Sequence, residues 1–190
     1  MPPTHPALSL LKEAFPDAAL MATEFRGDVT VVVAPKHLHP VLAFLKQHDA
    51  CRYDFLSDIA GVDYLNYPKA RADGPEGRFG VIYLLDTTGH AGGREFPRLR
   101  VKVLLDPSIP TDGIVADPGL HLPTATDLWP GAEWMEREVF DMFGIRFDKH
   151  PDLRRILTWE AFPAHPLRKD YPVKGRGERE NYEVIPRESA

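Results

Sequence analysis

The residues best suited to chemistry in this sequence lie in two dense charged stretches, 133–158 and 165–172. If the first stretch is helical, Glu133 and Arg137 are one turn apart, and so are Arg137 and Asp141. Such pairs commonly form a salt-bridged solvent face, worth about 0.2–0.5 kcal/mol per pair. The alternative is a carboxylate cluster that binds or catalyses. The spacing alone favours the solvent face, because charge runs of this kind are usually solvated.

Two enzymatic interpretations of these residues are weaker. Paired carboxyl groups could act as general acid and base, but Glu136 and Glu138 are two residues apart and point in different directions on a helix. A metal site built from Asp141, His150 and His165 matches no recurring ligand spacing, and each histidine precedes a proline in an extended segment. We therefore predict that this chain holds no catalytic residue, no cofactor-binding residue and no metal ligand.

The second stretch contains Arg168 and Lys169, which could hold a phosphate or a carboxylate. No glycine-rich loop of phosphate-binding spacing is found in the sequence, so a nucleotide site has no support. Pairing with a neighbouring subunit, or with other charges of the chain, is the favoured interpretation. The single cysteine, Cys51, has no cysteine partner and follows a predicted helix, which favours a structural thiol over a nucleophile.

The composition bounds the remaining possibilities. One cysteine in 190 residues excludes an intramolecular disulfide framework and a self-contained iron–sulfur cluster, which needs about four thiolates. The net charge of −5 argues against a nucleic-acid binder. The longest apolar runs, 31–34 and 81–85, are far shorter than the ~20 residues that span a bilayer, and the N-terminus does not resemble a signal peptide. We expect a soluble, cytosolic chain that reaches a membrane only through a partner.

Apolar periodicity outlines the elements that must position these residues. Helical spacing predicts helices at 8–15, after Pro35 through Leu45, and at 132–143, where Gly144 stands at the expected left-handed C-cap. The expected strands are 19–25, 29–34, 55–63, 79–86 and 99–106. The first two strands flank Arg26-Gly27-Asp28 and predict a hairpin. The order indicates an α+β fold, a mainly antiparallel sheet with helices on one face, followed by one helix and an extended proline-rich C-terminal arm.

The chain divides by composition into three parts. We predict an α+β body over 1–125, a motif helix over 126–145 and an extended docking arm over 146–190. Many of the 19 prolines fall after residue 145, where no long apolar period remains. The net charge is −7 over 1–145 and +2 over 146–190. A mildly basic arm without a core of its own suits the acidic surface of a partner, from which we expect its order to come.

Both charged stretches resemble the 30 kDa subunit family of respiratory complex I, the C subunits of NADH:quinone oxidoreductase. The resemblance rests on Glu136-Arg137-Glu138, on 141–145, on 150–157 and on 165–172. Weaker similarity extends through 58–64 and 123–128. The family often has glycine just before the histidine, where this chain has Lys149.

This resemblance implies a non-catalytic peripheral-arm subunit that packs beside the quinone-site subunit (D) and the terminal-cluster subunit (B), which carries the last iron–sulfur cluster. FMN and the iron–sulfur clusters would lie in partner subunits, and the complex would couple electron transfer from NADH to quinone with proton translocation at the cytoplasmic side of the bacterial inner membrane. Arg154, Arg155, Arg168 and Lys169 are expected to pair with acids of neighbouring subunits, and Glu136, Arg137, Glu138 and Asp141 to fix the helix and the start of the arm. The full predicted docking set is Glu136, Arg137, Glu138, Asp141, His150, Asp152, Arg154, Arg155, His165, Arg168, Lys169 and Asp170.

Two alternatives remain open at this point. Membrane-bound hydrogenases and other quinone- or methanophenazine-linked dehydrogenases use a similar subunit, and the sequence does not identify the electron donor. A free-standing enzyme that uses Asp141 and His150 is an alternative of a different class, and it predicts a stable, active monomer.

Overall fold

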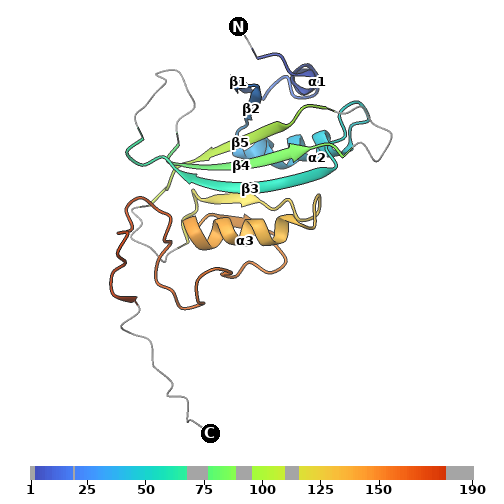
Figure 1. The fold of residues 1–190 in the computed structure, drawn as a ribbon. Coiled ribbons are helices and arrows are strands. Elements are labelled where there is room, and N and C mark those ends of the chain that lie inside the picture. Colours follow the sequence, from blue (N-terminus) through green and yellow to red (C-terminus); the bar gives the residue numbers. More distant parts are fainter. Residues whose placement is uncertain (1–2, 19, 68–76, 89–95, 110–115, 179–190) are drawn as a thin grey trace.

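The computed structural model describes residues 3–18, 20–67, 77–88, 96–109 and 116–178. Five strands form a sheet in the order β1-β2-β5-β4-β3, and β6 and β7 form a second, two-stranded sheet (Figure 1). The elements are α1 (Pro6–Ala14), β1 (Met21–Phe25), β2 (Asp28–Val32), the 3-10 turn η1 (Pro35–His37), α2 (Leu38–Gln47), β3 (Phe55–Asp63), β4 (Phe79–Asp86), β5 (Leu99–Leu105), β6 (His121–Pro123), α3 (Ala132–Phe143) and β7 (Arg146–Asp148).

The first two strands form the predicted hairpin. They pair antiparallel, with Phe25 opposite Asp28. Arg26 and Gly27 make the turn with φ angles of 53° and 87°. Two successive positive φ angles are typical of the tight turns that match the twist of a hairpin. The prediction from the Arg26-Gly27-Asp28 link is therefore confirmed.

The five-stranded sheet is mainly antiparallel, as predicted. β3 pairs antiparallel with β4, and β4 with β5. The exception is the pair of β2 and β5, which is parallel. It arises because β5 returns along the sheet between β2 and β4, which the chain order alone does not reveal.

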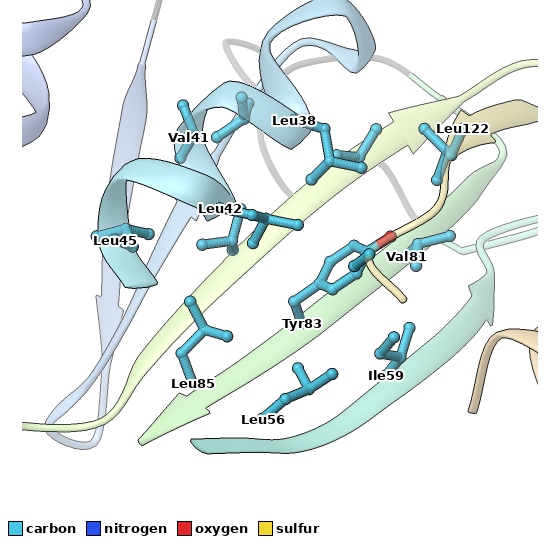
Figure 2. Close-up of a cluster of buried hydrophobic side chains, with 14 of the residues drawn as sticks. Leu38, Val41, Leu42, Leu45, Leu56, Ile59, Val81, Tyr83, Leu85 and Leu122 are labelled. Carbon is cyan, nitrogen blue, oxygen red and sulfur yellow. The ribbon is translucent and has the colours of Figure 1, made fainter. Parts of the chain in front are cut away.

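One face of the sheet holds the apolar core. Val81, Tyr83 and Leu85 alternate along β4 with half-buried residues and are inaccessible to solvent. α2 covers them with one apolar stripe (Figure 2). The stripe consists of Leu38, Val41, Leu42 and Leu45. Full burial of such a side chain contributes about 1.5–3 kcal/mol, so this helix is held by apolar area.

α3 packs on the same face of the sheet, against β3. Gly61 of β3 pairs with Val81, which points into the core, so the two residues share a face. A Cβ atom at Gly61 would lie 2.5 Å from the ring of Phe143, so the glycine permits this close helix–sheet approach. α3 ends as predicted at Gly144, whose φ of 76° is left-handed. The expectation of helices on one face is confirmed.

The segment after Gly144 differs from the expected coreless arm. Residues 146–148 form β7, which runs parallel to β6 and pairs Leu122 with Phe147. Phe147, Phe162 and Ala164 are buried. The rest of the described arm, to residue 178, consists of turns and bends that wrap around α3 (Figure 1). Much of its order thus comes from this chain itself, and not only from partners.

No helix within the described ranges combines the length and the apolarity that a bilayer span requires. The division at residues 125 and 145 stays a prediction.

Candidate functional site

The carboxylate of Asp141, near the end of α3, organises the start of the arm. Its side chain is inaccessible to solvent. Oδ2 accepts hydrogen bonds from the backbone N–H groups of Ile156, Leu157 and Thr158 at 3.0, 2.8 and 2.8 Å. Oδ1 accepts from Arg155 Nη1 at 2.7 Å and from the Thr158 hydroxyl at 2.5 Å. Burial alone would raise the pKa of Asp141, but these donors outweigh it and lower the pKa to about 2.

Arg137, one turn earlier on α3, binds the same part of the arm. Its Nε and Nη2 donate to the carbonyl oxygens of Arg154 and Arg155 at 3.1 and 3.2 Å. Arg137 thus donates hydrogen bonds to two backbone carbonyls of the irregular segment 154–158, and Asp141 accepts hydrogen bonds from three backbone amides of the same segment. The predicted solvent face, with ion pairs of Arg137 to Glu133 and Asp141, is wrong. Arg137 is only 6% exposed, and the side chains of Arg137 and Asp141 both bind the arm and not each other.

Glu136 occupies a buried position between α3 and the segment after β6. It accepts hydrogen bonds from the Thr124 hydroxyl at 2.5 Å and from the Ala125 N–H at 2.7 Å. Burial raises the pKa of Glu136 to about 7, although both hydrogen bonds act in the opposite direction. His150 Nε2 lies 3.9 Å from Glu136 and is 3.0 Å from the carbonyl oxygen of Glu133. The side chains of Glu136 and His150 are both inaccessible to solvent.

The C-terminal end of α3 is capped by two side chains of the arm. His165 Nδ1 donates to the Asp141 carbonyl at 2.9 Å, and Arg168 Nε donates to the Phe143 carbonyl at 2.6 Å. A Cβ atom at Gly144 would lie 2.5 Å from Arg168 Nη2 and 2.6 Å from His165 Nε2, so only glycine fits beneath them. Burial lowers the pKa of His165 to about 4 and keeps the imidazole neutral at pH 7. The last carbonyls of the helix, which lack helical partners, are thereby satisfied.

A third contact fastens the arm to the end of the sheet. Arg78 Nη2 lies 3.0 Å from Asp63 and 2.9 Å from Asp170. The backbone N–H of Lys169 donates to Asp63 at 2.8 Å. Asp63 is buried, and although burial alone would raise its pKa, the hydrogen bonds from Arg78 and Lys169 lower it. The ionised carboxylate thus joins β3, β4 and the arm.

The predicted docking residues therefore separate into two groups. Glu136, Arg137, Asp141, His150, Arg155, His165, Arg168 and Asp170 contact their own chain. In the second group the side chains of Asp152 and Arg154 pair only with each other in the described ranges, at 2.7 Å on the surface, Glu138 is exposed, and exposed Lys169 contacts the chain through its backbone N–H. The contacts of Arg137 and Asp141 agree with a role in fixing the start of the arm. Their docking role, like that of the whole set, stays a prediction.

Asp141 and His150 do not face a common site. His150 lies against the first half of α3, at Glu133 and Glu136, whereas Asp141 in the last half faces the arm. Within the part of the chain that the structure describes, no three His, Cys, Asp or Glu side chains are grouped so that they could hold a metal ion.

Sequence reasoning missed the neutral and distant partners of these groups. Thr124 and Thr158 supply the shortest hydroxyl contacts to the two buried carboxylates. Arg78 lies just before β4 and showed no pattern, whereas Asp63, at the end of β3, falls in the weakly similar stretch 58–64. Thr124 falls in the other weakly similar stretch, 123–128, so the weak resemblance was the signal that could have found both residues.

Comparisons with known proteins agree on one family. The family model described as "Respiratory-chain NADH dehydrogenase, 30 Kd subunit" matches residues 31–177. The NADH-quinone oxidoreductase C subunit of Trichlorobacter lovleyi is 43% identical over 182 residues, which are 96% of this chain and 97% of that protein. The corresponding C subunit of Thiobacillus denitrificans is 41% identical over 169 residues, 88% of this chain and 76% of that protein.

Two solved structures share the fold. The trypsin-resistant fragment of Nqo5 is 34% identical, with a TM-score of 0.61 over 77% of this chain and 98% of the fragment. A chain of the membrane-bound sulfane sulfur reductase, an archaeal respiratory membrane complex, is 21% identical. Its TM-score is 0.64 over 97% of this chain and 94% of that one. At this identity the second likeness concerns the fold alone.

Proposed function

The chain belongs to the family of the 30 kDa subunit of respiratory-chain NADH dehydrogenase, and from this premise we propose that it is a non-catalytic subunit of a proton-translocating NADH:quinone oxidoreductase. It docks through α3 and the arm to the quinone-site subunit and to the terminal-cluster subunit, at the cytoplasmic side of the membrane. The chain itself carries no cofactor, and FMN and iron–sulfur clusters in partner subunits carry the electrons from NADH to quinone.

The observation that carries this proposal is the position of the exposed apolar side chains. Of the eight large apolar side chains that are exposed in the described ranges, four lie on α3 or the arm: Trp134 (61%), Leu157 (63%), Leu167 (51%) and Val173 (105%). Single exposed apolar residues are ordinary, but several on one wrapped segment are typical of an interaction surface. The same segment is held rigidly from beneath by Arg137 and Asp141, so its outer side is preorganised for a partner.

The roles of the charged arm residues can be narrowed accordingly. Arg155 and Arg168 contact Asp141 and the Phe143 carbonyl of their own chain. Arg154 and Lys169 are exposed and remain the better candidates for ion pairs with neighbouring subunits. An exposed pair at the rim of an interface affects mainly the association rate and contributes little affinity. The apolar side chains should therefore dominate the docking energy.

Serine substitution of exposed leucines tests the docking surface. In cells that assemble the complex, Leu157→Ser and Leu167→Ser together should lower the amount of this subunit in purified membranes several-fold, with a parallel fall in NADH:quinone activity. Phe25→Ser is the matched control, because Phe25 is 68% exposed at the β1–β2 hairpin. Equal incorporation of the leucine variant and the wild type, or an equal loss in the control, would refute the arm as the docking surface.

Substitution is a sharper test than truncation after Ile145. Such a truncation would also remove Arg155 and Thr158 and would leave Asp141 without its donors. The truncated chain could then fail to assemble because it fails to fold.

The partners can be identified by cross-linking the assembled complex through lysine. Lys149, Lys169 and Lys174 are exposed on the arm, and Lys36 is exposed on the body. We expect cross-links from the arm lysines to the quinone-site and terminal-cluster subunits, and different partners or none for Lys36. Co-purification of an NADH-binding flavoprotein is expected as well, whereas a nickel-site subunit in its place would replace the NADH-linked assignment with a hydrogenase.

A further inference from the structure

A cavity of about 250 Å³ lies between the last turns of α3 and the arm. Aromatic rings of Phe140 and Phe162 form part of its lining. The charged side chains that line it are Arg146, Arg155 and Glu160. The cavity is therefore neither a purely apolar gap nor a uniformly basic surface.

The guanidinium of Arg146 lines this cavity without an ion-pair partner in the described ranges. Its backbone is fixed in β7, where its N–H donates to the Leu120 carbonyl at 2.8 Å. Its guanidinium lies over the ring of Phe140, 5.2 Å from the centroid. Among the described residues this guanidinium has neither an acidic partner nor a hydrogen bond, although it is only half exposed. A preorganised arginine with free donors is a strong receptor for a carboxylate.

Neither of the other two charged side chains of the cavity, Arg155 and Glu160, forms an ion pair with Arg146 in the described ranges. Arg155 Nη1 donates hydrogen bonds to Asp141 and Thr158, so the charge of Arg155 is balanced by Asp141 within the chain. Glu160 has no ion pair in the described ranges, and it makes the cavity unfavourable for a doubly charged anion such as a phosphate. The unpaired charges of the cavity in the described ranges are thus one guanidinium, Arg146, and one carboxylate, Glu160. A partner that meets both must bring a carboxylate for Arg146 and hydrogen-bond donors for Glu160.

We propose that an acidic side chain, Asp or Glu, of a neighbouring protein subunit enters this cavity and pairs with Arg146. Peptide N–H groups beside that side chain would donate to Glu160, and its aliphatic part would pack on Phe140 and Phe162. The inference rests on the proposed function, because it assumes that this face lies in a protein interface. It adds Arg146 and Glu160, which the sequence did not single out, to the docking surface.

The test compares three substitutions of Arg146 in the assembled complex. Arg146→Glu should reduce incorporation of the subunit about tenfold or more, because it places two carboxylates together. Arg146→Gln should reduce it less, and Arg146→Lys should remain near the wild type, because the charge is retained. Arg26→Glu is the matched control, since Arg26 also lies over a neighbouring phenylalanine ring, that of Phe25, but at the hairpin. The melting temperature of each isolated full chain should stay within about 2 °C of the wild type, since the Arg146 guanidinium has no ion pair or hydrogen bond among the described residues.

The outcomes separate the inference from the proposed function. Equal incorporation of Arg146→Glu and the wild type would overturn the inference alone. Binding of the isolated chain to anionic phospholipid vesicles that is lost in Arg146→Glu would also overturn it, in favour of a lipid headgroup. Failure of the wild-type chain to co-purify with any membrane complex would instead overturn the proposed function.

Discussion

α2 and α3 cover the same face of one sheet, but they are held there by different interactions. α2 buries Leu38, Val41, Leu42 and Leu45 and no charged residue. α3 buries Glu136, Arg137 and Asp141 beside its apolar residues. The difference follows from what each helix touches on its other side. On its outer sides α2 makes only a few side-chain contacts within the described part of the chain, such as that of His39 with Asp127 and of Phe44 with Phe15, whereas α3 lies between the sheet and an arm without regular structure.

An irregular segment on a protein core needs partners for its backbone groups. Residues 154–158 belong to no helix or strand, so their N–H and C=O groups are not paired by a ladder. Arg137 and Asp141 supply those partners from α3. The buried charges thus replace secondary structure in the arm, while Leu157 on its outer side stays 63% exposed. The two helices should accordingly respond to different kinds of substitution.

The largest effect is expected for Asp141→Ala. It removes the acceptor of three backbone amides and leaves Arg155 without its charge partner, which costs about 3–5 kcal/mol for a buried pair. Urea unfolding of the full chain measures this loss. Hydrogen exchange should also show faster exchange of the amides of 156–158. Glu138→Ala, exposed on the same helix, should change stability by less than about 0.5 kcal/mol. A loss below about 1 kcal/mol for Asp141→Ala would break the comparison.

Leu42→Ala should cost about 3 kcal/mol through lost transfer energy and a residual cavity. Leu42 is 1% exposed between α2 and the sheet. Urea unfolding measures the loss, and exchange at 156–158 should rise no more than elsewhere. Leu167→Ala, at a leucine that is 51% exposed, is the control. Preferential loosening of the arm in Leu42→Ala would show that the two helices are not independent.

Glu136 gives α3 a pH dependence that α2 lacks. Its pKa is about 7 in the folded chain against 4.5 in the unfolded chain, so the folded state binds more protons between these values. The contribution is fully present below pH 4.5 and is lost as the pH rises to about 7. The loss of stability between pH 5 and pH 7 from this carboxyl group amounts to about 2 kcal/mol.

Glu136→Gln should remove this fall in stability. Urea unfolding at pH 5, 6 and 7 measures the difference between the variant and the wild type. The difference between the two proteins is needed because His165 has a pKa of about 4 in the folded chain and 6.5 in the unfolded chain. Its contribution to stability therefore increases as the pH rises over part of the same range, in both proteins. Asp141 acts elsewhere: its contribution is present above pH 3.8 and is lost as the pH falls toward 2. Parallel profiles for Glu136→Gln and the wild type would contradict the assignment.

The local features of the fold could be read from the sequence. The helix at 132–143 and its cap at Gly144 follow from an apolar period that ends at a glycine. The hairpin follows from the Arg26-Gly27 link between two β-rich runs. Each of these depends on residues that are near in the chain.

The features that depend on distant residues could not be read. The spacing of Arg137 and Asp141 is equally suited to a local ion pair and to two separate contacts with a segment 14–18 residues further on. Pairing of β2 with β5 likewise depends on which strand enters between two others. Family resemblance singled out stretches whose charged residues the structure places in buried contacts, but the direction in which each charge points required the structure.

The smallest effect is expected at Lys149, the position where the family often has glycine. Lys149 follows β7 with φ of 64°, in the left-handed region, which costs a residue with a side chain about 1–2 kcal/mol. Lys149→Gly relieves this strain but adds about 0.5–1 kcal/mol of backbone entropy to the unfolded chain, so a net gain below about 1 kcal/mol is expected. Thermal unfolding measures it as a small rise in melting temperature. Lys174→Gly, at an exposed lysine of the arm without a positive φ, should give no such rise, because there glycine only adds entropy to the unfolded state. Equal shifts in both variants would mean that the turn before His150 is not strained and that the buried contacts of α3 alone determine the path of the arm.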